Sequence, residues 1–192
     1  MKKKVLFGVI ALALVACVAI GGTIAYLTFT TKTITNTFTV GKIDFGDSFG
    51  ETTGSEYKMV PGTNMAKDPK LVIKKGSETA WVFIEVKETN VADYLTWAAR
   101  DGWTQLTTAG CPNKLYYRTY TADANNDTTY YFLAGDAASS YPNGCVAIKD
   151  TVSGISGSAP QLAFKAGAIQ KEGTGTVAEA WVKLAGSDKT LF

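Results

Sequence analysis

Residues 79–87 read TAWVFIEVK and carry the strongest strand pattern in the chain. Successive side chains of a strand point to opposite faces, so apolar residues at every second position indicate a buried face. The pattern predicts a strand with one face in a core and a second face that begins covered and ends in solvent. The first face holds Ala80, Val82, Ile84 and Val86, and the second holds Trp81, Phe83, Glu85 and Lys87.

The sequence outward from this strand is typical of an all-β protein. Thr, Val, Tyr, Phe and Trp are abundant, and Gly and Asn divide them into short runs. The expected fold is a two-sheet, jelly-roll-like sandwich with one or two short helices in the loops, preceded by an N-terminal signal helix. Further strand candidates are residues 33–40, 71–74, 115–121, 129–133, 145–152 and 162–170.

Two short helices are expected in the loops of this sandwich. Asn90 is placed to cap a helix over residues 91–99. Thr174 or Thr176 is placed to begin a second helix, and Gly186 is placed to end it. Both segments carry an apolar stripe at helical spacing.

The first 25 residues have the organisation of a signal peptide. Three lysines at positions 2–4 precede an uncharged apolar run, and a glycine pair ends that run. Thr23 and Ala25 then form the small-x-small pattern that a signal peptidase reads before Tyr26. We therefore expect residues 1–25 to be removed during export by a signal peptidase, and residues 26–192 to form a single secreted β-sandwich domain.

Two other fates of the N-terminal segment stay open. The apolar run is close to the roughly 20 residues that a transmembrane anchor needs, so an uncut anchor is one alternative. Residues 14–17, LVAC, look like a lipobox, which would place a lipid on Cys17. The residues after Cys17 are apolar, whereas a lipoprotein tether is usually polar. In the favoured interpretation, the protein meets the membrane only through the uncleaved signal peptide.

Cleavage changes the charge balance. The full chain has 19 basic and 17 acidic residues and a pI near 8.3. Without the three N-terminal lysines the counts are 16 and 17, so the net charge of the domain is near −1. This balance gives no indication of a nucleic-acid partner.

The absence of histidine excludes many kinds of active site. Ser-His-Asp and Cys-His arrangements, His-rich zinc sites and the usual general base near neutral pH all require it. Dinucleotide-binding, P-loop and HExxH motifs are missing as well, and no carboxylate pair stands out for hydrolysis. We therefore expect no cofactor, no catalytic residues and no enzymatic activity.

Residues 115–121 and 129–133 are predicted to form a hairpin around a polar tip at residues 122–128. This tip has the spacing that begins a calcium loop, but the glycine and the bidentate glutamate of such a loop are missing. It is a weak metal candidate, and Asx turns are the simpler interpretation. The candidate ligands are Asp123, Asn125 and Asp127.

Cys111 and Cys145 remain after export, as an even pair in a protein that leaves the reducing cytosol. A disulfide between them would close a loop of about 35 residues and would stabilise the domain by roughly 3 to 4 kcal/mol in the chain-entropy model. Two buried thiols are the alternative.

Aromatic side chains are plentiful and allow two interpretations. They can form a sugar-binding platform on a secreted sandwich, or they can pack in the core and across strands. The residues are Trp81, Trp97, Trp103, Trp181, Tyr116, Tyr117, Tyr120, Tyr130, Tyr131 and Tyr141.

The most specific motif is residues 21–41, GGTIAYLTFTTKTITNTFTVG. It resembles the start of TasA/camelysin-type proteins of Gram-positive bacteria, which carry a signal peptide served by a SipW-type signal peptidase. Later segments look like the same family. These are Val60-Pro61-Gly62, Lys67-Asp68-Pro69, the strand around Trp81 to Val86, Ala168-Ile169-Gln170 and Ala178-Glu179-Ala180-Trp181.

The resemblance implies a jelly-roll sandwich in the extracellular matrix or at the cell surface. The best-known members assemble into extracellular fibres of the biofilm matrix, and camelysin itself is described as a surface metalloprotease. No metal-site residue carries over, because this sequence has no histidine to receive it. The implied partners are further copies of the chain and other matrix proteins.

Three functions remain as hypotheses. The first is a secreted structural subunit of cell-surface or biofilm-matrix fibres, which assembles by donating its N-terminal strand to a neighbour. The second is a surface-attached polysaccharide-binding module, and the third is a camelysin-like protease. The apolar residues of the donor strand are Tyr26, Leu27, Phe29, Ile34, Phe38 and Val40.

We predict that the secreted protein starts at Tyr26, because the small residues Thr23 and Ala25 follow a broken apolar run. N-terminal sequencing of secreted material checks this. A lipidated Cys17 at the start, or an intact Met1 in a membrane fraction, would contradict it.

Overall fold

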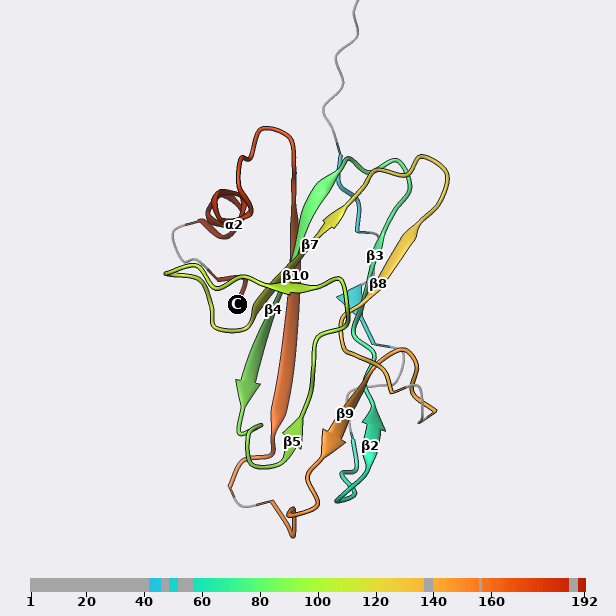
Figure 1. Ribbon diagram of the computed structural model, residues 1–192, viewed down its shortest axis with the longest axis vertical. Coiled ribbons are helices and arrows are strands. Elements are labelled where there is room, and N and C mark those ends of the chain that lie inside the picture. The colour runs from blue at the N-terminus through green and yellow to red at the C-terminus, as the bar shows by residue number, and fades with distance from the viewer. Residues whose placement is uncertain (1–41, 46–48, 52–56, 137–139, 156, 187–189) are drawn as a thin grey trace, which may run out of the picture. The chain divides into compact units, whose positions relative to one another are not determined.

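The computed structural model describes residues 42–45, 49–51, 57–136, 140–155, 157–186 and 190–192. Within them the chain forms antiparallel sheets and one short helix (Figure 1). The all-β prediction is confirmed, and the arrangement is consistent with a sandwich. The expected signal peptide at residues 1–25 and the expected strand at residues 33–40 lie outside the described residues.

The largest sheet is built around the strand on which the sequence analysis began. β4 (Ala80–Thr89) lies inside this sheet, with β10 (Gln161–Gln170) paired along its whole length. On its other side lies β7 (Leu115–Tyr120), followed by the short β6 (Thr104–Gln105). The strand order is therefore β10-β4-β7-β6, and every pair is antiparallel.

Two smaller sheets, each of three strands, complete the β structure. The chain passes from one to the other between β2 and β3 at Lys67-Asp68-Pro69, where the proline has no N–H to donate to a ladder. Their orders are β1-β3-β8 and β2-β9-β5. The bounds are β1 (Phe49–Gly50), β2 (Asn64–Ala66), β3 (Lys70–Ile73), β5 (Leu95–Thr96), β8 (Thr128–Tyr131) and β9 (Cys145–Ile148).

All three sheets contribute to one apolar core. The alternation predicted for the central strand is confirmed, because Ala80, Val82, Ile84 and Val86 are all buried. Phe132 is fully buried in this core, with aromatic rings packed around it at centroid distances from 5.2 to 5.8 Å. Those rings belong to Trp97, Trp103, Tyr116 and Phe164.

The second face of β4 is covered by the helix α2 (Val177–Ala185). Of the two predicted starts, Thr176 begins this helix, where it forms a capping box with Glu179, and Gly186 ends the helix as predicted. Trp181 is fully buried against Phe83, with ring centroids 5.3 Å apart. This face is covered further than the sequence suggested, because buried Glu85 accepts hydrogen bonds from the backbone and side chain of the C-terminal segment.

Two local predictions are wrong. Residues 91–99 form one turn and then the strand β5, instead of a helix. The apolar stripe is real, since Val91, Tyr94 and Leu95 are buried, but a single turn at Val91 suffices to bury it. The expected hairpin is also absent from the described strands: β7 pairs with β4 and β6, whereas β8 pairs with β3 in another sheet.

We expect Trp181→Ala to lower the free energy of unfolding by about 3 to 5 kcal/mol, because it removes a fully buried indole and leaves a cavity. Val182→Ala on the same helix is the matched control. Its side chain is 50% exposed, so its effect should stay within about 0.5 kcal/mol. Urea unfolding monitored by circular dichroism measures both, and equal effects would contradict the packing described for α2.

Candidate functional site

The most unusual feature of the fold is the outer edge of β10. Within the described residues β10 pairs only with β4, so no strand occupies its other edge. β10 has 10 residues, while the other outer strands of the three sheets have between two and four. Unpaired N–H and C=O groups along such an edge are a template for another strand.

The core-facing side chains of β10 are incompletely covered. Leu162, Phe164, Ala166 and Ala168 pack against the main core but remain partly exposed. Their neighbours across the ladder, on β4, are mostly buried. An apolar row that is covered on one side only indicates that the core stops short of this edge.

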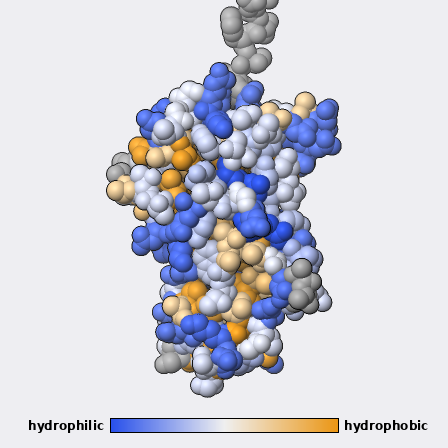
Figure 2. All heavy atoms as spheres, in the orientation of Figure 1, coloured by the Kyte–Doolittle hydropathy of each residue, from blue (hydrophilic) through white to orange (hydrophobic). Residues whose placement is uncertain are grey.

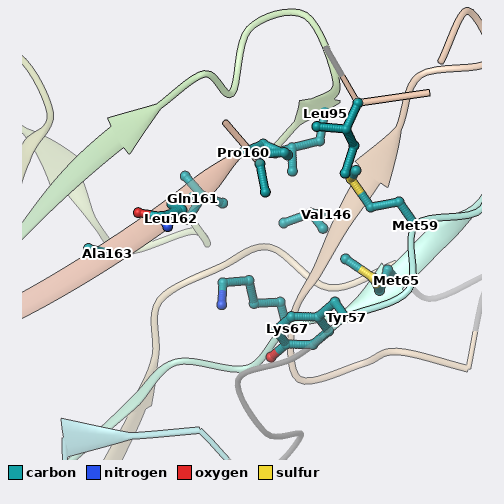
Figure 3. Close-up of a pocket in the computed structure, with 12 residues that line it drawn as sticks. Tyr57, Met59, Met65, Lys67, Leu95, Val146, Pro160, Gln161, Leu162 and Ala163 are labelled. Atoms are coloured by element: carbon teal, nitrogen blue, oxygen red, sulfur yellow. The ribbon is translucent and has the colours of Figure 1, made fainter. Parts of the chain in front are cut away.

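A cavity of about 670 Å³ opens beside the first half of β10, and we call it the β10 groove. Figure 3 shows Met59, Met65 and Tyr57 on one side of it, with Pro160 and Leu162 on the other. In Figure 2, apolar residues gather in the lower half of the molecule, where Figure 1 places β5 and β9, and in a second patch at the upper left, where Figure 1 places α2. The lining also includes Lys67, Leu95, Val146, Ile155, Ala159, Gln161 and Ala163.

One buried cation lies in the lining of the groove. Lys67 is 8% exposed, and its Nζ lies 2.7 Å from Oε1 of Glu51. The Tyr57 hydroxyl donates a hydrogen bond of 2.7 Å to the other carboxylate oxygen. The same ammonium lies 4.8 Å from the centre of the Tyr57 ring and 5.4 Å from that of Phe164. The carboxylate and the rings compensate for the loss of hydration that burial of a charge causes.

The β10 groove was not among the predicted sites. Lys67-Asp68-Pro69 was noted only as a family-like motif, and all three residues are buried. The exposure of alternate residues in β10 cannot be read from the sequence, because it depends on which strands fail to pair with it.

Several predicted site residues lie outside the described part of the chain. These are the cleavage residues Thr23, Ala25 and Tyr26, and the donor-strand residues Tyr26, Leu27, Phe29, Ile34, Phe38 and Val40. Cys17, the alternative lipidation site, lies outside it as well.

The weak metal candidate has the geometry of a turn. Oδ1 of Asp123 accepts hydrogen bonds from the backbone N–H groups of Asn125 and Asn126, and these bonds lower the pKa of the Asp123 carboxyl. Asp127 instead binds the Lys74 side chain and the backbone N–H of Lys75. No group of three or more His, Cys, Asp or Glu that could hold a metal occurs among the residues that the structure describes.

Cys111 and Cys145 form no disulfide in the structure, so the expected bond is not present. Cys111 packs against the small cluster around Trp181, whereas Cys145 belongs to β9 in another sheet. Burial is the main cause that raises the pKa of the Cys145 thiol, and the charge of Asp136 adds to it. The protonated thiol is therefore favoured at Cys145.

Most of the aromatic residues proposed for a sugar platform are engaged in packing. Trp103, Trp181 and Tyr120 are buried. Trp81 packs edge-on against Tyr117, and the Lys171 ammonium lies over its ring at 4.4 Å. The guanidinium of Arg118 lies 3.8 Å from the centre of the Tyr130 ring.

Comparison with known families identifies the family of the chain. The family described as camelysin metallo-endopeptidase matches residues 1–99, which is more than half of the chain. The chain belongs to this family. The match covers the segment expected to be a signal peptide and the strands up to β5, including Lys67 and Glu51. A search of curated proteins found no match, and a search of solved structures found none either.

Membership confirms the resemblance inferred from the sequence. Camelysin- and TasA-type proteins are generally extracellular or surface-associated, which supports a secreted, matrix-type protein at the level of the family. The description of the family as metallo-endopeptidases leaves proteolytic activity open. Within the described residues, no helix is long and apolar enough to cross a membrane.

We predict that Lys67→Met lowers the free energy of unfolding by about 3 kcal/mol, because it leaves the Glu51 carboxylate without its cation in a largely buried position. Adding Glu51→Gln should recover part of the loss, since removing both charges is far less costly than removing one. The exposed Lys58→Met is the matched control and should change stability by less than about 0.5 kcal/mol. Urea unfolding measures all three, and equal values for the two lysine variants would contradict the prediction.

Proposed function

We propose that this protein is a secreted structural subunit of cell-surface or biofilm-matrix fibres, and that each subunit donates its N-terminal strand to the next. The observation that supports this function most directly is the open, 10-residue edge of β10 beside an apolar groove. Addition of a strand at this edge would satisfy the unpaired backbone groups and cover the half-exposed side chains at the same time.

The proposed donor is residues 26–40, which lie directly before the described fold in the sequence. The segment has 15 residues and no proline, so it is long enough to run along β10 and free to donate every backbone N–H. Ile34, Phe38 and Val40 would share one face of the donated strand, together with Asn36 between them. That face matches the apolar row of β10.

Donation to a neighbouring copy makes a contact between two different surfaces, the strand and the edge. Such a head-to-tail contact repeats without closing and therefore gives a filament. The signal peptide would hold the donor segment at the membrane until cleavage, so assembly would follow export. The alternative for the same segment is to complete the edge of its own domain, which gives a monomer.

Deletion of residues 26–35 should leave a folded, soluble domain that does not polymerise. Sedimentation velocity and electron microscopy of the deleted and the intact secreted protein measure this directly. A synthetic peptide of residues 26–40 should bind the deleted protein, whereas the same peptide with Ile34→Asp and Phe38→Asp should bind at least tenfold more weakly, because each charge would enter an apolar site.

Two results would contradict the proposal. One is fibre formation by the deleted protein at the same concentration as the intact protein. The other is an intact protein that stays monomeric and instead sediments with polysaccharide, or cleaves casein in a chelator-sensitive reaction. These results would support the binding-module and protease hypotheses respectively.

A further inference from the structure

The β10 groove contains both methionines of the exported domain. The sequence has three methionines, and Met1 belongs to the signal segment. Met59 and Met65 both line the groove, although Met59 lies before β2 and Met65 within it. Both side chains pack against the main core and are partly exposed.

Methionine gives the groove two chemical properties. Its flexible, polarizable thioether adapts to different apolar side chains, which suits a docking surface. A peroxide also converts it to a sulfoxide: the sulfur gains one oxygen and loses two electrons, while the peroxide is reduced to water. The product is polar, so the lining of the groove would change from apolar to hydrogen-bonding.

The position of the two methionines exposes them to peroxide and places any sulfoxide where a docking strand would bury it. A cavity of about 670 Å³ that opens to solvent admits a molecule as small as hydrogen peroxide. Opposite the methionines lie Pro160 and Leu162, which have no side-chain hydrogen-bond donors for a sulfoxide oxygen, and Gln161, whose side-chain amide can donate. Lys67, the only cation among the described residues that line the groove, is held by Glu51. A strand that covers the groove would therefore bury two sulfoxides where, in the described lining, Glu51 already engages Lys67 and Tyr57 and the Gln161 amide is the remaining side-chain donor.

We propose that the β10 groove is an oxidation-sensitive docking surface, in which oxidation of Met59 and Met65 by peroxide prevents a strand from docking. This inference rests on the proposed function, because it concerns the regulation of the same edge. An occupied groove shields both thioethers, so assembled fibres resist oxidation while free subunits are open to it.

The test treats the intact secreted protein with hydrogen peroxide before assembly. Peptide mapping by mass spectrometry records a gain of about 16 Da on each oxidised methionine. Sedimentation then measures the concentration needed for assembly, which should rise at least tenfold when both residues are oxidised, since burial of an unpaired polar group is unfavourable. Treatment with methionine sulfoxide reductases should restore assembly.

Two variants separate methionine from thiol chemistry. Met59→Leu/Met65→Leu keeps side-chain volume nearly constant, and it should assemble equally well before and after peroxide. Cys111→Ser/Cys145→Ser removes both thiols of the domain and should remain as sensitive as the unmodified sequence. In preformed fibres, both methionines should be oxidised several-fold more slowly than in subunits.

The failures of the two proposals differ. If the untreated protein does not assemble, the proposed function and this inference are both overturned. If the untreated protein assembles and the doubly oxidised protein assembles at the same concentration, only the oxidation inference is wrong. The oxidation inference is also wrong if the Met59→Leu/Met65→Leu variant loses assembly after peroxide treatment.

Discussion

The structure depends on the burial of both faces of β4. One face supplies Val82 and Ile84 to the main core, and the other supplies Phe83 to the cluster under α2. The strand is paired with β10 along its whole length and with β7 from Ala80 to Glu85, so most of its backbone groups have partners within the sheet. The helix α2 packs on this strand, and the C-terminal segment reaches it through buried Glu85.

Because β4 lies inside the sheet, the two edges of the neighbouring strand β10 differ in their pairing. Its inner edge is bonded to β4 over 10 residues, while no described strand covers its outer edge. Natural sheets usually protect an edge with a short strand, a charge that points inward, a proline or a bulge. β10 is long, has no proline, and directs Leu162 and Phe164 toward the core. Protection by a further strand is the device that fits these features.

The sequence predicted the elements whose pattern is long and regular. The alternation of β4 and a helix that starts at Thr174 or Thr176 were both predicted, because each depends on neighbouring residues. The helix predicted after Asn90 was wrong, because one turn followed by a strand also buries an apolar stripe at helical spacing. The pairing of strands could not be predicted from local sequence. β7 and β8 are close in the chain, yet they belong to different sheets.

The composition of the β10 groove explains why sequence motifs did not reveal the candidate site. No residue type in it is diagnostic, and its properties come from the meeting of β2, β9 and β10. Lys67 is informative only in three dimensions, where its ammonium joins Glu51, Tyr57 and Phe164 across the layers. A buried ion pair contributes little net stability compared with apolar packing, but it fixes the position of the charges it contains. At this place in the fold, it holds Tyr57 against the groove and fixes the shape that an incoming strand would meet.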